Sequence, residues 1–233
     1  MALGGSYASG TDSFAAAVLN NTSSYGARST GSIALGDKAN APGAKAIAIG
    51  QLSTSSGNNT IAIGGNCEAT INYATAIGFY AKADTIGKYA YASNIFAATG
   101  DCQTGTFVLS RASTNGTPVV LTADSSAPGN NDQVILPNNS AYAFTGIVVA
   151  RQQAAGGTAS AAWKIEGLIR REGSAGTTTL VASTVTAIDN TPGWTLALSA
   201  DTTNGGLKIE ATGAAATNIR WVATVQTSEV TYA

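Results

Sequence analysis

The chain has 233 residues, which is enough for one large domain or two domains of moderate size. Its 12 Lys and Arg residues nearly balance its 13 Asp and Glu residues, so the net charge of -1 offers no basic surface for nucleic acid. No histidine is present, which removes the most common general base and metal ligand. We therefore expect no nucleic-acid partner, no metal and no cofactor.

The amino terminus, residues 1–6, lacks the basic segment and apolar core of a signal peptide. The chain also lacks a run of about 18 apolar residues, so we expect no membrane insertion. Either a leader was removed, or the chain folds in the cytoplasm, and the initial Met favours the second reading. Cys67 and Cys102 are two isolated cysteines, for which free thiols are favoured and a bridge stays open.

A repeat occupies residues 1–92. Four glycines stand fourteen residues apart, and each closes a tetrapeptide in which small and β-branched residues alternate. A fixed period of this kind predicts a solenoid, and alternation with period two predicts two short strands in each coil. Glycine is expected to supply the positive φ that the corners need. The residues that define the repeat are Ile33, Gly36, Gly43, Ile47, Ile49, Gly50, Gly57, Ile61, Ile63, Gly64, Ile77 and Gly78.

The repeat is expected to degenerate at both ends, where terminal coils shield the core from water. Phe14 fits the apolar position of an early half-copy, whereas Ile86-Gly87 after the last clear copy breaks the fourteen-residue spacing. Ile and Ala are both expected at inward positions. Because such side chains make a thin core, we expect further burial against copies of the same chain.

The segment Ser32–Gly43 resembles the head repeat of trimeric autotransporter adhesins of the YadA type, and similar repeats occur in bacteriophage fibre proteins. This resemblance implies a homotrimer of left-handed parallel β-rolls in which the isoleucines point inward.

Residues 93–140 are interpreted as a β-rich transition or neck. Thr106–Ser110 and Thr117–Thr122 are predicted strands, and Thr114-Asn115-Gly116 between them is a typical hairpin turn. A loop rich in Ser, Gly and Asn and one more short strand are expected at residues 125–132 and 133–136.

Residues 141–233 contain six alternating segments joined by turns rich in Gly and Asn. Trp163 and Ile165 share one face while Lys164 and Glu166 share the other, which is typical of half-buried strands. This pattern predicts an antiparallel β-sandwich or jelly roll that holds the main core. The predicted strands are Tyr142–Arg151, Ala161–Arg171, Thr177–Ile188, Gly193–Ser199, Gly206–Thr212 and Asn218–Glu229.

Three segments here, Ser160–Gly167, Ala200–Leu207 and Ile219–Ala223, resemble carboxy-terminal domains of tailed-phage fibre and other virion proteins. The resemblance implies a distal domain that contacts the host or another virion component.

Catalysis is not expected from the acidic residues. A glycosidase needs two carboxyl groups that flank the scissile bond, and the acids here are scattered, with Glu166, Asp201 and Glu210 as the candidate neighbours. Acids on the polar face of a strand are more often solvated or paired with Lys or Arg. Gly87-Lys88 is followed by Tyr89, so it fails the pattern of a phosphate-binding loop.

Two clusters could bind sugar, but each has a structural reading that we favour. Arg170-Arg171-Glu172 could hold an anionic sugar, or it could end a strand and pair internally. Tyr73, Phe79 and Tyr80 could stack on carbohydrate, or they could cap the roll where the isoleucines end. Receptor-binding residues cannot be chosen from these patterns.

Together, these observations predict a non-enzymatic, trimeric, all-β virion fibre or appendage protein. Residues 1–92 would form a β-roll shaft, residues 93–140 a neck and residues 141–233 a β-sandwich knob. The protein would attach to a bacterial surface glycan or protein through multivalent binding. The alternatives are a structural virion component, such as a capsid decoration or tail joint protein, a bacterial trimeric surface adhesin, and a spike that degrades polysaccharide. The expected location is the virion, assembled in the host cytoplasm, or alternatively the bacterial cell surface.

Overall fold

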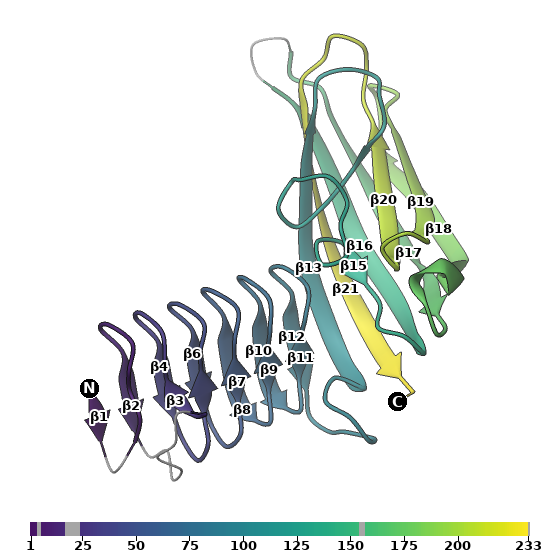
Figure 1. The fold of residues 1–233 in the computed structure, drawn as a ribbon. Helices are drawn as coiled ribbons and strands as arrows, with labels where there is room; N and C mark the ends of the chain where they lie inside the picture. The colour runs from purple at the N-terminus through teal and green to yellow at the C-terminus, as the bar shows by residue number, and fades with distance from the viewer. Residues whose placement is uncertain (4–5, 17–23, 154–156, 233) are drawn as a thin grey trace. The chain divides into compact units, whose positions relative to one another are not determined.

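A computed structural model of the chain describes residues 1–3, 6–16, 24–153 and 157–232. It divides into two compact units, Met1–Gly105 and Thr106–Tyr232, so residues 93–140 are shared between them (Figure 1). Apart from a short 3₁₀ turn at Ala175–Thr177 (η2), the regular elements in these ranges are all strands. The predicted all-β fold class is therefore confirmed.

The first unit is a stack of coils with two strands in each regular coil (Figure 1). The first roll sheet runs in the order β1 (Ala2–Leu3), β2 (Phe14–Ala16), β4 (Ile33–Leu35), β6 (Ile47–Ile49), β8 (Ile61–Gly65), β10 (Thr75–Phe79) and β12 (Tyr89–Ala92). The second roll sheet contains β3 (Gly26–Ala27), β5 (Asn40–Ala41), β7 (Thr54–Ser55), β9 (Glu68–Ala69) and β11 (Lys82–Ala83). All the pairings recorded within these two sheets are parallel, which confirms the predicted solenoid.

Alanine, rather than isoleucine, fills the interior of each coil. Ala34, Ala48 and Ala62 are fully buried, whereas the Ile and Leu residues on either side of them are only half-buried. Since neighbouring residues of a strand point to opposite faces, a buried Ala places both its neighbours on the outer face. The prediction that Ile and Ala share the inward positions is therefore wrong for Ile within a single chain.

The glycines of the repeat have two different roles. Gly36, Gly50, Gly64 and Gly78 have φ values from +112° to +127°, as predicted for a corner. Gly43 and Gly57 do not have positive φ, and the prediction is wrong for them; they are glycines because the coils stack too closely for a side chain. A Cβ atom on Gly43 would lie 2.0 Å from the carbonyl oxygen of Gly57.

The left-handed corner positions with φ near +55° to +65° recur every seven residues and are mostly not glycine. They carry Gly31, Lys38, Lys45, Leu52, Asn59, Asn66, Tyr73, Tyr80 and Gly87.

The fourteen-residue register continues beyond Gly78. Thr75 pairs with Tyr89 and Ile77 with Tyr91, while Ala92 takes the place of the next repeat glycine. The predicted break at Ile86-Gly87 is therefore wrong, since Gly87 occupies a corner position fourteen residues after Tyr73. At the other end, Phe14 pairs with Ile33, so its predicted place in the apolar position is confirmed.

The second unit contains two sheets. The large sheet runs in the order β13 (Cys102–Ser113), β21 (Ile219–Thr231), β16 (Ser140–Gln152), β17 (Ser160–Arg171) and β18 (Thr179–Asp189). In the small sheet, β20 (Gly206–Thr212) pairs with β14 (Val119–Val120), β15 (Val134–Ile135) and β19 (Thr195–Asp201). The six strands predicted after residue 140 are all present, with small shifts at their ends.

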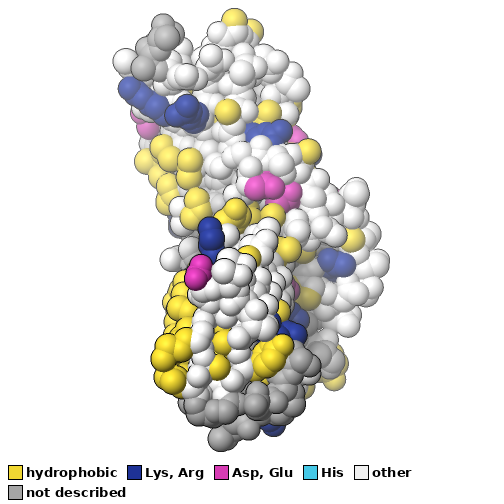
Figure 2. Space-filling view, turned by 60° about the vertical axis from the view of Figure 1, so that its left-hand side comes forward, with side chains coloured by type: hydrophobic (Ala, Val, Ile, Leu, Met, Phe, Trp, Pro, Cys, Tyr) yellow, Lys and Arg dark blue, Asp and Glu magenta, His cyan; other side chains and the backbone are white. Residues whose placement is uncertain are grey.

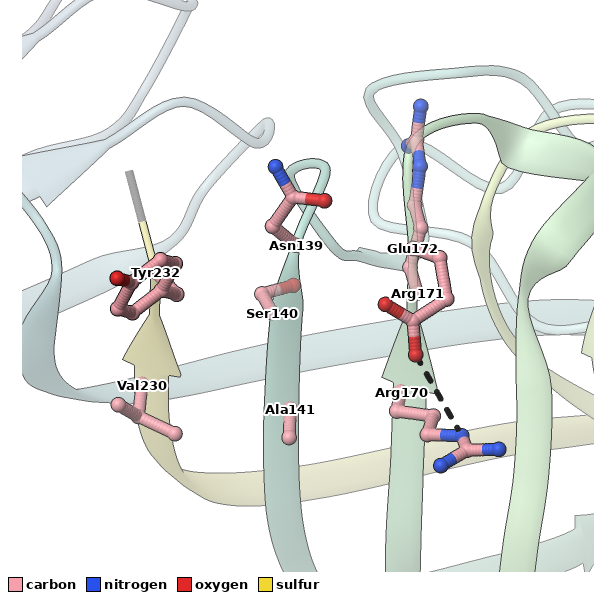
Figure 3. Close-up of a pocket in the computed structure, with 8 residues that line it drawn as sticks. All are labelled: Asn139, Ser140, Ala141, Arg170, Arg171, Glu172, Val230 and Tyr232. Carbon is pink, nitrogen blue, oxygen red and sulfur yellow. Dashed lines mark ion pairs between the residues drawn. The ribbon is translucent and has the colours of Figure 1, made fainter.

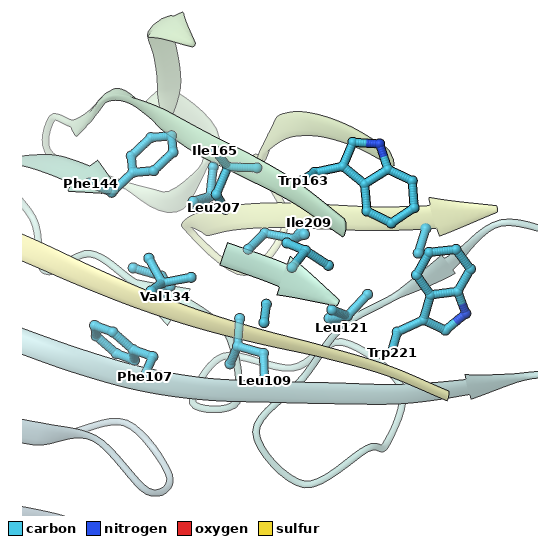
Figure 4. Close-up of a cluster of buried hydrophobic side chains, with 14 of the residues drawn as sticks. Phe107, Leu109, Leu121, Val134, Phe144, Trp163, Ile165, Leu207, Ile209 and Trp221 are labelled. Carbon is cyan, nitrogen blue, oxygen red and sulfur yellow. The ribbon is translucent and has the colours of Figure 1, made fainter. Parts of the chain in front are cut away.

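Both sheets of this unit contribute to one hydrophobic core (Figure 4). The indole rings of Trp163 and Trp221 stack with centroids 5.8 Å apart, and the Trp194 ring lies 5.6 Å from that of Trp221. The Trp221 Nε1–H donates a hydrogen bond of 2.9 Å to the buried Ser113 Oγ. Because inward Leu207 and Ile209 of β20 pack in the same cluster, the two sheets face each other across it.

The hairpin predicted around Thr114-Asn115-Gly116 is only partly formed. β13 and the segment after the turn are joined only by the Ser110–Thr122 bridge, and β14 pairs with β20 instead. The apolar residues that follow the turn are drawn into the small sheet, where Leu121 is fully buried in the shared core.

Candidate functional site

Outward apolar side chains form two parallel rows on the first roll sheet, and we call them together the outer ladder. Its members are held in register by the parallel pairing of the strands. The row that begins at Leu35 is apolar in every coil, whereas Thr75 interrupts the row that begins at Ile33. Figure 2 shows hydrophobic side chains gathered on the surface of the molecule. The outer ladder consists of Ile33, Leu35, Ile47, Ile49, Ile61, Ile63, Ile77, Tyr89 and Tyr91.

The ladder ends in an aromatic group on β10 and β12. Tyr89, Tyr91 and Phe79 are 43%, 45% and 44% exposed. The Phe79 ring lies over Gly65, and a ring carbon of Tyr91 would be only 3.3 Å from a Cβ atom on Gly78. The rings of Phe79 and Tyr91 therefore pack against glycine backbone on the outer face.

The aromatic residues predicted to cap the roll are placed differently. Tyr73 occupies a left-handed corner and is 64% exposed, and Phe79 is on the outer face, so neither closes the coil interior, where alanines continue to Ala92. Tyr80 is half-buried and contacts the Phe79 ring edge-on at 4.5 Å. Tyr89 and Tyr91 were missed in the sequence, although they stand fourteen residues after Thr75 and Ile77.

The three acids considered for catalysis are each engaged in local contacts. Glu166 lies 2.8 Å from the Lys164 ammonium, and Glu210 lies 2.6 Å from that of Lys208. Asp201 accepts hydrogen bonds from the backbone N–H groups at 203 and 204 and from two side-chain amides. Burial raises the pKa of Asp201, but these donors outweigh it and leave the pKa lowered. A carboxyl group of this kind stays ionised at neutral pH and is a poor general acid.

The Arg170-Arg171-Glu172 cluster borders a pocket of about 350 Å³ at the ends of β16, β17 and β21 (Figure 3). Arg170 and Glu172 form an ion pair of 3.9 Å, and Arg171 donates a 2.7 Å hydrogen bond to the carbonyl oxygen of Leu136. The favoured reading, in which this cluster ends a strand and pairs internally, matches these contacts. The pocket also has the side chains of Asn139 and Tyr232 at its border.

Both cysteines are free thiols. Cys67 is fully buried inside the roll, and its Sγ–H faces the carbonyl oxygen of Gly78 at 3.3 Å. Burial raises the pKa of both thiols, and the charge of Asp101 raises that of Cys102 further. A raised pKa keeps a cysteine in the less nucleophilic thiol form.

Within the ranges that the structure covers, no group of three or more acidic or cysteine side chains comes together as a metal site. Those same ranges contain no helix that is long and apolar enough to cross a membrane.

Comparison with known proteins identifies the repeat. The family model for the YadA head domain repeat matches residues 27–53, 41–66 and 55–81. Residues 27–81 therefore carry YadA-type head repeats, and the resemblance inferred from Ser32–Gly43 is confirmed. Among proteins with curated functions, none matches this chain.

Three solved phage tailspikes show a low structural similarity to the chain. Tailspike gp49 of Acinetobacter baumannii bacteriophage Fri1, a capsular polysaccharide depolymerase, has a TM-score of 0.31 and 13% identity. The values are 0.27 and 13% for the tailspike of Acinetobacter phage vB_ApiP_P1, and 0.26 and 9% for that of Acinetobacter baumannii phage AM24. The alignments cover 94%, 94% and 92% of this chain but only 36%, 51% and 42% of the respective tailspikes.

Proposed function

We propose that the chain is a non-enzymatic virion fibre or appendage protein that forms a homotrimer and attaches to a bacterial host surface. The observation that carries this proposal is the outer ladder, in which large apolar side chains stay half-exposed in every regular coil. Exposed apolar surface in register over several strands is typical of an interaction site. The head repeats at residues 27–81 support the trimer, because they resemble the head repeats of trimeric adhesins of the YadA type.

The size of the ladder suggests how much of the association it could supply. A half-buried Ile or Leu side chain has about 1 kcal/mol of burial still to gain, so the seven aliphatic members offer roughly 7 kcal/mol per chain. Association itself costs about 4–15 kcal/mol. The ladder alone would therefore hold a trimer only marginally, and the second unit is expected to contribute contacts of its own.

The contacts of the acids support the non-enzymatic part of the proposal. Glu166 and Glu210 are paired with lysines, and Asp201 accepts hydrogen bonds from three donors in its own turn and from the Gln133 side chain. Attachment would instead depend on multivalency: three weak sites on one rigid axis raise the avidity by about 10²–10⁴ without any new contact.

A structural virion component is the second candidate, and the outer face of the large sheet favours it. Ile147, Val149, Leu168 and Val222 are all exposed there, so this face is suited to burial against another virion protein. In that case the second unit would be covered in the particle and would not reach the host. The YadA-type repeats are equally compatible with a bacterial adhesin on the cell surface.

The attachment claim is tested with fluorescently labelled protein and flow cytometry on a panel of bacterial strains. We expect the wild type to be retained by at least one strain. The variant Ile49→Lys/Ile63→Lys, which places charges in the ladder, should become monomeric and lose roughly 100-fold in retention. Ser56→Lys, at an exposed position outside the ladder, is the matched control and should bind like the wild type.

Three outcomes would contradict parts of the proposal. A trimer that is retained by no strain favours the structural component. A monomeric ladder variant that binds as well as the wild type removes the avidity argument. Sugar released from the envelope of bound cells would make the protein an enzyme.

A further inference from the structure

Two arginines lie directly side by side on the outer face of the large sheet. Arg151 of β16 and Arg220 of β21 are register partners, and both are exposed. Their neighbours Ala150 and Trp221, also register partners, are buried in the core, so strand alternation fixes the arginines on the outer face. Like charges directly opposite each other on paired strands are destabilising, so this pair acts against the fold.

The pair is not neutralised by an acid in the described part of the chain. Arg151 donates only to the carbonyl oxygen of Thr158, and Arg220 has no hydrogen bond or ion pair there. Three other cations of this unit behave differently, since Lys164, Arg170 and Lys208 each pair with a Glu two residues further along the chain. Asp189 of β18 pairs with Ala162 of β17, and it instead accepts hydrogen bonds from the N–H and Oγ1–H of Thr191.

The side chains around the pair suit a sugar ring. Ser160 is exposed and is the partner of Arg151 on β17, so it offers a hydroxyl beside the guanidinium. The next outward row contains Val149 and Val222, which are register partners and are 47% and 39% exposed. Two guanidinium groups can hold a carboxylate by paired hydrogen bonds, while the valines can contact the C–H face of the ring.

We propose that Arg151 and Arg220 form a binding site for the acidic groups of a bacterial surface polysaccharide, such as uronic acid carboxylates. This site would give the proposed attachment function its ligand class, and it rests on that function. An acidic glycan fits better than nucleic acid, because the outer face near the pair has valines instead of aromatic rings for base stacking, and the chain has a net charge of -1. The sequence cluster Arg170-Arg171 does not serve this role, because it pairs internally at the opposite end of β17.

The site is tested by binding of the full chain to immobilised polygalacturonate, with neutral dextran and duplex DNA as comparison surfaces. We expect binding to polygalacturonate that weakens as salt is raised, and none to dextran. Arg151→Gln/Arg220→Gln should bind at least about 10-fold more weakly. Arg170→Gln removes an exposed arginine that has an acidic partner, so it is the matched control and should retain the wild-type affinity.

The thermal unfolding of the double variant shows that it is folded, and its midpoint should be unchanged or raised because the repulsion is gone. The proposal is overturned if the wild type does not bind polygalacturonate or if the double variant binds it as well as the wild type does. Equal binding to duplex DNA would also overturn it, since the pair would then be a general anion site.

Cell binding separates this proposal from the proposed function. If the double variant is retained on bacteria as well as the wild type, attachment stands and the arginine site fails. If the arginines bind polygalacturonate but the wild type is retained by no strain, the site stands and attachment fails.

Discussion

A methyl group on Gly50 is expected to disrupt the coil stack more than a methyl group on any open corner. Gly50 has a φ of +112°, and its Cβ atom would lie 1.9 Å from the carbonyl oxygen of Gly64 in the next coil. The backbone conformation costs about 1–2 kcal/mol for an L-residue. Overpacking adds about 1–3 kcal/mol, because the carbonyl oxygen of Gly64 belongs to the backbone and cannot move aside by changing rotamer. We therefore expect Gly50→Ala to destabilise the first unit by about 2–5 kcal/mol.

Two matched variants separate these causes. Gly87 has a φ of +65°, and a methyl group added there would meet no atom within 4 Å, so Gly87→Ala should cost only the backbone contribution of about 1–2 kcal/mol. Gly43 lacks positive φ but would place its Cβ 2.0 Å from the oxygen of Gly57, so Gly43→Ala isolates the clash.

The assay is chemical denaturation followed by two probes. All three tryptophans belong to the second unit, so their fluorescence reports that unit while far-UV circular dichroism reports both. Gly50→Ala should shift the dichroism transition to lower denaturant and leave the tryptophan transition in place. If Gly50→Ala is as stable as Gly87→Ala, the coils are not stacked as closely as the reasoning requires.

Three further changes probe the corners, a loop and the core. Lys45→Asn should raise the stability of the roll by about 0.5–1 kcal/mol, since Asn tolerates the left-handed φ of +55°. The reciprocal Asn59→Lys in the next coil should lower the stability by the same amount. Midpoints of thermal unfolding that do not shift in opposite directions for the two variants would refute this. The buried Asp101 accepts three backbone N–H bonds, and although burial raises its pKa these bonds leave the pKa lowered. Its stabilisation is therefore present above the unfolded pKa of about 3.9 and is lost as the pH falls through the folded pKa. Asp101→Asn should remove that acid dependence, and hydrogen exchange of the loop amides between pH 5 and pH 2 that is unchanged from the wild type would contradict it. Ser113→Ala leaves the buried Nε1–H of Trp221 without its acceptor and should cost about 1–3 kcal/mol by tryptophan fluorescence, whereas a neutral result would show that another acceptor replaces it.

The repeat could be predicted from the sequence because its period is strict, but the direction of its side chains could not. Alternation places Ile47 and Ala48 on opposite faces without saying which face is inside. The structure decides this, since the buried apolar side chains of the roll are small, as at Ala48. Hydrophobicity alone would assign large apolar residues such as these to the core. On the outer face they instead indicate a surface for association.

The carboxy-terminal end of the repeat could not be predicted correctly, because the residue types change there while the fourteen-residue register of the strands is kept. Tyr89 and Tyr91 replace β-branched or aliphatic residues, and Ala92 replaces the glycine, yet the strands remain fourteen residues apart. Counting positions, instead of matching residue types, would have extended the ladder by one coil.

In the second unit, alternation predicted the strands well but not their partners. The strand around Val119 follows a strong turn signal, yet it pairs with β20, more than eighty residues later in the chain. The arginine pair was missed for the same reason: Arg151 and Arg220 are 69 residues apart in sequence, and only the register of β16 and β21 brings them together.

The central claim is that three chains share the outer ladder, and the native mass of the protein tests it most directly. Light scattering on a sizing column should give about 70 kDa, three times the 23.2 kDa chain, for the wild type, and about 23 kDa for Ile49→Lys/Ile63→Lys. A wild type of 23 kDa would contradict the claim, because the ladder would then remain exposed in solution.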